Sequence, residues 1–110
     1  MELSLDYYPL LHRGLVRERN EDRCGAFEPE EAALRAQRGH LFIVADGMGG
    51  LTAGDVAAET AVRGVQEAYF RDAWRGPAEQ LRAAFAAANA RIVALAEHRG
   101  HESMGAAVVA

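Results

Sequence analysis

LFIVADGMGGLTAGDVAAE, residues 41–59, joins a short apolar run, an aspartate, a glycine-rich segment and a helix-like pattern in that order. The run at 40–46 has the length and composition of a strand buried on both faces. Thr52 and Asp55 form a T-x-x-D pattern that can satisfy free N–H groups where a helix begins. Small apolar residues then recur every three or four positions up to Tyr69, which predicts a helix.

The rest of the chain predicts further short elements. Residues 3–8 alternate in the manner of a strand, and residues 12–29 suggest two extended pieces joined around Asn20. The charged segment 30–39 is expected to be a surface connection with room for a helical turn. An apolar stripe after Pro77 predicts a second helix that stops at Gly100, and the apolar segment 104–110 predicts a final strand.

Composition limits the classes of protein to consider. A chain of 110 residues makes one domain or part of one, and 50% hydrophobic with 25% charged residues is ordinary for a soluble globular protein. Sixteen acidic residues against 12 basic ones give a net charge of -4, which disfavours nonspecific nucleic-acid binding. Cys24 is the only cysteine, so no intramolecular disulfide can form.

We find neither a membrane span nor a signal peptide in the sequence. No apolar run approaches the roughly 18 residues of a membrane span. The first 15 residues lack a basic region followed by an apolar stretch, so no signal peptide is expected. We therefore expect a cytoplasmic protein with no membrane partner, in which Cys24 is a small core residue.

The glycine-rich segment fails the usual nucleotide fingerprints. A dinucleotide motif starting at Gly47 needs glycine at position 52, which is Thr52. A P-loop starting at Gly49 needs lysine after Gly54, where the chain has Asp55. Asp46 would repel a phosphate, so the segment suits a cation better, with a main-chain carbonyl as a second oxygen. Since Asp-Gly is also a common turn dipeptide, a purely structural interpretation stays open.

A second polar cluster, RERNED at residues 17–22, lies in an apparently extended segment. In a strand Arg17 and Glu21 share one face, because they are four residues apart. Asp22 would then project to the other face unless a bulge or bend redirects it. A solvated charged turn is the competing interpretation of this cluster.

The two clusters together resemble one protein family. RERNED, followed by VADGMGG at 44–50, AGDVAAE at 53–59 and the later Met-Gly pair, is similar to the metal-dependent serine/threonine protein phosphatases of the PPM, or type 2C, class, especially their bacterial branch. The resemblance runs over essentially all 110 residues. It implies an α+β fold, a four-layer sandwich of two antiparallel sheets between helices, of which residues 1–110 would be the N-terminal portion.

The resemblance also implies roles for individual residues. Arg17 would bind the substrate phosphate. Glu21 and Asp22 would belong to the metal site, directly or through water. Asp46 would bridge two Mg²⁺ or Mn²⁺ ions, and the carbonyl of Gly47 would bind one of them. Two such ions about 4 Å apart acidify a bridging water for in-line attack on phosphorus, so no covalent phosphoenzyme is needed.

The chain departs from the family pattern in two ways. Ala106 and Ala107 stand where the family usually has threonines after Met-Gly, and the later segments that carry two further metal-binding aspartates are absent. We therefore expect a hydrolase family that acts on phosphorylated proteins, and a 110-residue chain that is inactive alone and associates through an exposed sheet, by dimerising or aggregating. A non-catalytic binding or assembly module is the alternative, and a nucleotide-binding domain is the weakest hypothesis.

Overall fold

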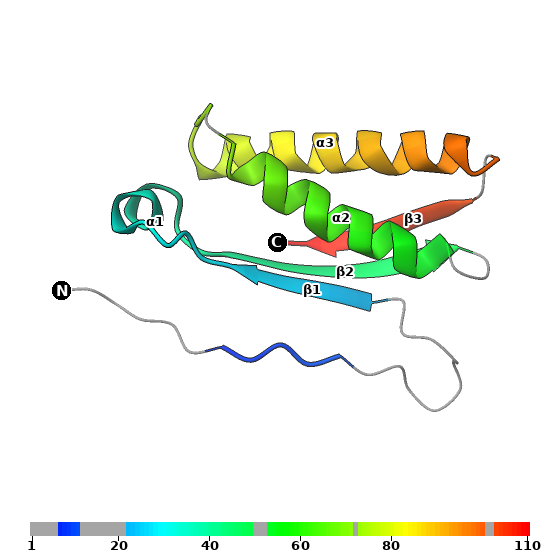
Figure 1. Ribbon diagram of the computed structural model, residues 1–110, viewed down its shortest axis with the longest axis horizontal. Helices are drawn as coiled ribbons and strands as arrows, with labels where there is room; N and C mark the ends of the chain where they lie inside the picture. The colour runs from blue at the N-terminus through cyan, green and yellow to red at the C-terminus, as the bar shows by residue number, and fades with distance from the viewer. Residues whose placement is uncertain (1–6, 12–21, 50–52, 72, 101–102) are drawn as a thin grey trace.

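The computed structural model describes residues 7–11, 22–49, 53–71, 73–100 and 103–110. These residues form three helices and one three-stranded antiparallel sheet (Figure 1). In chain order the elements are β1 (Asp22–Phe27), α1 (Ala32–Arg38), β2 (Leu41–Gly49), α2 (Ala53–Tyr69), α3 (Pro77–His98) and β3 (Met104–Val109). The fold class is α+β, as the sequence predicted.

The sheet has the order β1-β2-β3, with β2 in the centre. α2 packs on all three strands, while α3 packs on α2 and contacts β3, so both long helices lie on one face of the sheet (Figure 1). This arrangement of helices over one antiparallel sheet is consistent with half of a four-layer sandwich.

β2 alternates strictly between the two faces of the sheet. Leu41, Ile43 and Ala45 are buried beneath the helices, whereas Phe42 and Val44 are 40% and 57% exposed. The apolar run predicted a strand buried on both faces, and in the described residues only the helix side is buried. The run is continuous because β2 carries large apolar residues on its open side as well.

The helix side of the core is built from small residues. Eight alanines are buried there, and the largest fully buried side chains are Ile43 and Val65. Gly64 of α2 lies so close to α3 that a Cβ atom added to it would be 3.0 Å from both the Cα and the Cβ of Ala88. Small side chains therefore set the short distance between the two helices.

Several boundaries follow the sequence signals. α3 begins with Pro77 directly after the cap residue Gly76 and ends at His98, two residues before Gly100, whose φ is 79°. Residues 32–38 form a helix of seven residues, more than the single turn that we expected. The predicted strand at 3–8 lies mostly outside the described residues, and Tyr7 and Tyr8 have no regular secondary structure.

Trp74 lies in the connection between α2 and α3. Its ring packs edge-on against Tyr69, with 5.5 Å between ring centroids, and the guanidinium of Arg38 lies 4.9 Å from its centroid. The Tyr69 hydroxyl donates a hydrogen bond of 2.8 Å to the Arg38 carbonyl. These contacts attach the end of α1 to the end of α2.

Candidate metal centre

Two aspartates lie directly opposite each other on adjacent strands of the sheet. Asp22, the first residue of β1, pairs in register with Asp46 of β2. Directly opposite residues of an antiparallel pair project to the same face with their Cβ atoms about 4.5–5.5 Å apart. The two carboxylates therefore share the open side of the sheet, away from the helices.

The pairing with Asp46 fixes the face of the sheet on which Asp22 lies. An ideal strand running through Arg17 and Glu21 would have sent Asp22 to the other face of the sheet from those residues. The structure shows that Asp22 shares a face with Asp46. Arg17 and Glu21 lie outside the described residues, so their roles stay predictions.

The position of Asp46 differs from the sequence interpretation. We expected Asp46 to end its strand and Gly47 to open a turn, but β2 continues to Gly49. Gly47 is part of the ladder and pairs in register with Ala106 of β3. Asp46 is therefore held from both sides, by Asp22 on one strand and by Ala107 on the other.

The glycine requirement is clearest at Gly49. A Cβ atom added there would lie 2.8 Å from the Ala53 Cβ and 2.9 Å from the Ser103 carbonyl oxygen, and Gly49 has a φ of 154°. No larger side chain fits without a shift, so the end of β2 and the start of α2 pack at backbone distance. The glycine keeps α2 close to the strand that carries Asp46.

A polar network that the sequence analysis missed lies on the helix side of β1. Arg23 faces α2, where its Nη2 is 3.9 Å from Asp55 Oδ2 and its Nε is 3.5 Å from Glu59 Oε2. The spacing of Asp55 and Glu59, four residues apart on one helix face, was the available signal. We had interpreted Asp55 as the partner of Thr52 in a capping pattern, but Thr52 lies outside the described residues.

The donor atoms fit a hard divalent cation. Carboxylate and carbonyl oxygens are the ligands that suit Mg²⁺ and Mn²⁺, and Asp22, Asp46 and the Gly47 backbone offer only oxygen. Like charges placed directly opposite each other destabilise a sheet, and a bound cation would remove that repulsion. Within the described ranges, no group of three or more His, Cys, Asp and Glu side chains could hold a metal ion. The described carboxylates are therefore too few to make such a site by themselves.

Two of the four histidines, His40 and His98, lie in the described residues. His40 lies directly before β2, where its Nε2 is 3.3 Å from Glu28 Oε1. His98 ends α3, whereas His12 and His101 lie outside the described residues.

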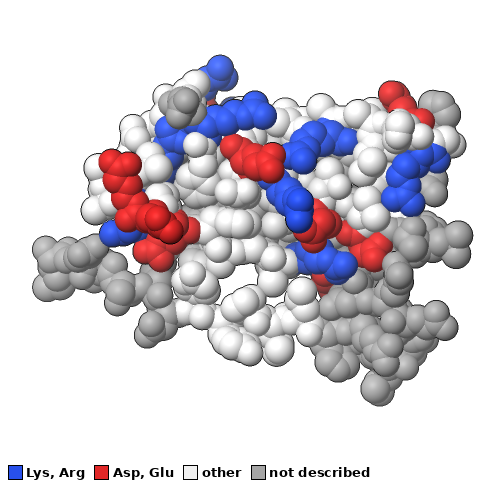
Figure 2. Space-filling view, viewed as in Figure 1, with Lys and Arg blue, Asp and Glu red and all other residues white. Residues whose placement is uncertain are grey.

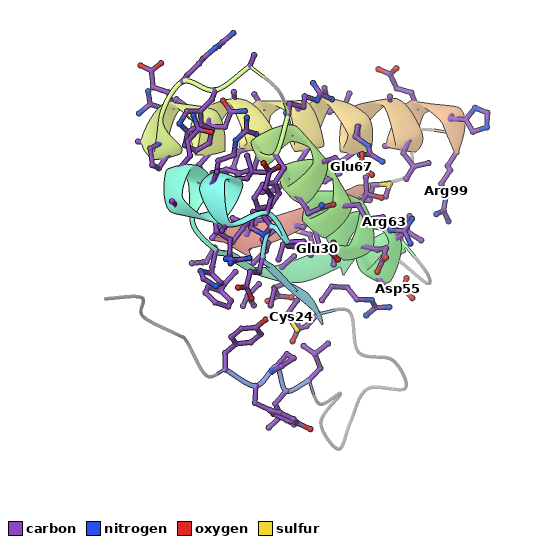
Figure 3. The ribbon with its side chains drawn as sticks, turned by 60° about the vertical axis from the view of Figure 1, so that its left-hand side comes forward. Cys24, Glu30, Asp55, Arg63, Glu67 and Arg99 are labelled. Atoms are coloured by element: carbon purple, nitrogen blue, oxygen red, sulfur yellow. The ribbon has the colours of Figure 1, made fainter. Side chains whose placement is uncertain are left out.

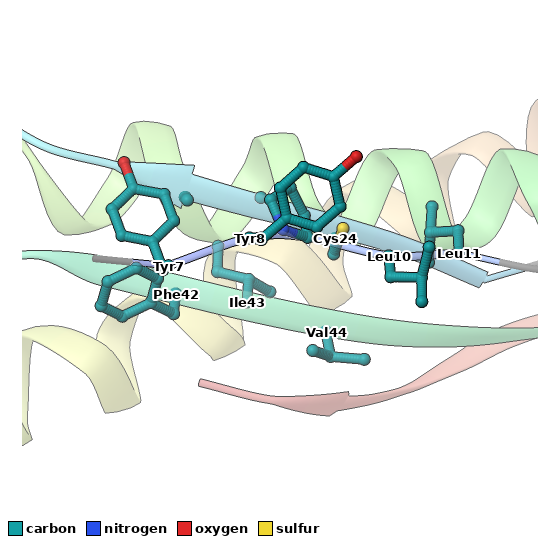
Figure 4. A pocket seen from close by; sticks show the side chains of 11 residues that line it. Tyr7, Tyr8, Leu10, Leu11, Cys24, Phe42, Ile43 and Val44 are labelled. Atoms are coloured by element: carbon teal, nitrogen blue, oxygen red, sulfur yellow. The ribbon is translucent and has the colours of Figure 1, made fainter. Parts of the chain in front are cut away.

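Cys24 lies on the open side of β1, in register with Val44. It lines an apolar hollow of about 250 Å³ between the sheet and residues 7–11 (Figure 4). Tyr7 packs edge-on against Phe42 at the rim of this hollow, with 4.9 Å between ring centroids. Cys24 is thus half-buried on the open side of the sheet and is not part of the core beneath the helices, where we expected it.

Comparison with known proteins gives relatives of one kind. The chain is 46% identical over 63 residues to the serine/threonine phosphatase stp of Listeria innocua serovar 6a, and equally to those of Listeria welshimeri serovar 6b and Listeria monocytogenes serotype 4b. The chain is related to bacterial serine/threonine phosphatases. The resemblance drawn from the RERNED and DGMGG motifs is therefore confirmed.

The likeness to these phosphatases is partial. The match covers 57% of this chain and 21% of each phosphatase, so it spans about a fifth of their length. No protein-family model matches the chain. In the described part of the chain, no helix is both long enough and apolar enough to cross a membrane.

Proposed function

We propose that this chain carries the N-terminal part of the catalytic centre of a metal-dependent phosphoprotein phosphatase that hydrolyses phosphoserine and phosphothreonine. The observation that carries the proposal is the pairing of Asp22 with Asp46 on the open side of the sheet. The phosphatase names of the relatives support the reaction class.

Each candidate residue of the chain would have its own role in this centre. Asp46 would hold the shared position of the centre from the middle strand, and Asp22 would support it from β1. The Gly47 carbonyl and Glu21 would add oxygen ligands, and Arg17 would bind the oxygens of the substrate phosphate with its planar guanidinium. Bound Mn²⁺ or Mg²⁺ would supply an acidified water and neutralise charge on the phosphoryl oxygens.

A Mn²⁺ titration by calorimetry tests the metal part of the proposal. We expect the wild-type chain to bind Mn²⁺ and Asp46→Asn to bind at least about tenfold more weakly, because an amide oxygen carries no full charge. Glu67→Gln is the matched control, since Glu67 lies on α2 and pairs with Arg91 at 2.7 Å. Equal affinity in wild type and Asp46→Asn would reject the assignment.

The phosphatase activity needs a separate assay. We expect the 110-residue chain to turn over p-nitrophenyl phosphate negligibly with Mn²⁺ present, because two-ion catalysis needs more carboxylates than Asp22 and Asp46 supply. In a chain with the full family domain, Arg17→Ala should lower kcat/KM by about 10- to 100-fold and leave Mn²⁺ affinity nearly unchanged.

A second candidate, a non-catalytic assembly module, is favoured by one observation. Large apolar side chains lie exposed on the open side of the sheet, among them Val44 at 57%, Met48 at 58% and Val109 at 75%. Such a face promotes association. Light scattering coupled to size exclusion should show dimers or larger species of the wild type and fewer of Val44→Lys, and a monomeric wild type would reject this candidate.

A further inference from the structure

Arg23 lies between the candidate metal centre and the helix that covers the sheet. It follows Asp22 on β1, so its side chain points to the opposite face, toward α2. Its Nη1 donates a hydrogen bond of 2.8 Å to the Asp22 carbonyl oxygen, while Nε and Nη2 face Glu59 and Asp55. One guanidinium therefore contacts the backbone of a candidate ligand residue and two carboxylates of α2.

The two carboxylates belong to the part of α2 nearest to the centre. Asp55 lies in the first turn, near the β1 strand that carries Cys24 (Figure 3), and Glu59 lies one turn further on. The start of α2 is packed against the end of β2 at Gly49. Arg23 thus connects the strand of Asp22 with the helix that follows the strand of Asp46.

Among the described residues, Asp22 pairs across the sheet only with Asp46, whereas Asp46 on the central strand pairs with both Asp22 and Ala107. A strand paired on one side opens more readily than one paired on both sides, so the described ladder holds Asp22 less firmly than Asp46. The Asp55 side chain is only 17% exposed and that of Arg23 is 32% exposed, so solvent weakens their attraction only in part.

We propose that Arg23 is a positioning residue of the metal centre: its contacts with Asp55 and Glu59 hold the start of β1 at the distance from β2 that lets Asp22 and Asp46 bind one cation. This inference rests on the proposed function. It assigns no ligand role to Arg23, whose guanidinium lies on the opposite side of the sheet from the two carboxylates.

The sign of the effect separates positioning from simple electrostatics. Removing a positive charge near a cation site should by itself strengthen cation binding, because the like-charge repulsion falls. Loss of a positioning contact should weaken binding. Arg23→Met keeps the length of the side chain and removes the donors, so the direction of the change in Mn²⁺ affinity shows which effect dominates.

The test is a Mn²⁺ titration by calorimetry on the chain and its variants. We expect Arg23→Met to raise the Kd for Mn²⁺ about tenfold, at the lower end of the usual effect of outer-shell changes. Arg63→Met is the matched control: Arg63 binds the same Glu59 at 2.9 Å, but its side chain is 68% exposed and belongs to α2 itself. Its Kd should equal that of the wild type or be slightly lower.

Two further variants show whether the ion pair is the cause. Asp55→Asn should weaken Mn²⁺ binding, and the double variant Arg23→Met/Asp55→Asn should be little worse than the more affected single variant, because both remove one contact. Arg23→Lys keeps the charge and one donor group, so it should restore part of the affinity. Circular dichroism of each variant checks that it is folded. If Arg23→Met is not folded, the Mn²⁺ affinities of Arg23→Lys and Asp55→Asn are compared with that of the wild type instead.

The outcomes separate this inference from the proposed function. Unchanged or tighter Mn²⁺ binding by folded Arg23→Met overturns the positioning role, and so does an equal loss in Arg63→Met. If Asp46→Asn abolishes binding while Arg23→Met has no effect, the metal centre stands and only this inference falls. A wild-type chain that binds no Mn²⁺ overturns both.

Discussion

The two faces of the sheet carry different kinds of side chain, although the same strands form both. On the helix side, β2 contributes Leu41, Ile43 and Ala45, each less than 5% exposed. On the open side, the alternating positions carry Phe42, Val44 and Asp46, all exposed. The first set supplies burial and hence stability, whereas the second set carries the groups that we assign to metal binding.

The outer surface of the helix side carries charged side chains of both signs. On the face drawn in Figure 2, acidic and basic side chains lie next to each other rather than in a patch of one sign. Arg91 of α3 and Glu67 of α2 form one such ion pair, with 2.7 Å between Nη1 and Oε2. Exposed pairs of this kind contribute only about 0–1 kcal/mol each, so the apolar packing below them is the main source of stability.

The largest expected effect comes from adjacent residues on opposite sides of the sheet. Ile43→Ala should lower the free energy of unfolding by about 2–5 kcal/mol, because it leaves a cavity beneath the helices. Val44→Ala should cost less than about 1 kcal/mol, since Val44 projects from the open side and loses mainly strand propensity. Urea unfolding followed by circular dichroism measures both changes. Similar losses would mean that the open side is covered in solution.

A smaller effect on stability is expected at Tyr69, whose hydroxyl is buried on the helix side. Burial raises the pKa of Tyr69 from its ordinary value of 10.0, and the nearby Arg38 guanidinium opposes that rise in part. The unfolded chain therefore loses this proton first as the pH rises. Stability from Tyr69 is fully present below about pH 10 and is lost as the pH rises through the folded-state pKa.

Tyr69→Phe tests this contribution. The change removes the 2.8 Å hydrogen bond to the Arg38 carbonyl and should cost about 1 kcal/mol at pH 7. It should also flatten the fall in stability above about pH 10, which urea unfolding at several pH values would detect. Tyr8→Phe is the control, because Tyr8 is 87% exposed. An unchanged alkaline slope in Tyr69→Phe would contradict the assignment.

Local signals predicted the elements well, because each rests on neighbouring residues. The Gly76-Pro77 pair marked the start of α3, and the apolar segment after position 103 marked β3. The motif pattern also brought Asp22 and Asp46 into one candidate site. Relations between strands could not be predicted in the same way, since register depends on pairing across the sheet. The extension of β2 to Gly49 and the contact of Arg23 with Asp55 therefore came only with the structure.

The smallest expected effect concerns Ala107, which lies exposed on the open side next to Asp46. Ala107→Thr introduces the residue type that the sequence resemblance led us to expect here, and Ala107→Val matches the shape of threonine without its hydroxyl. Both should raise the free energy of unfolding by about 0.5 kcal/mol, because β-branched residues suit a strand. Threonine should exceed valine by a few tenths of a kcal/mol if its hydroxyl donates to the Asp46 carboxylate. Urea unfolding of the three proteins, measured side by side, gives the comparison. Equal gains in the free energy of unfolding for threonine and valine would show that the threonine hydroxyl makes no such bond. Ala107 would then affect only the strand and not the candidate centre.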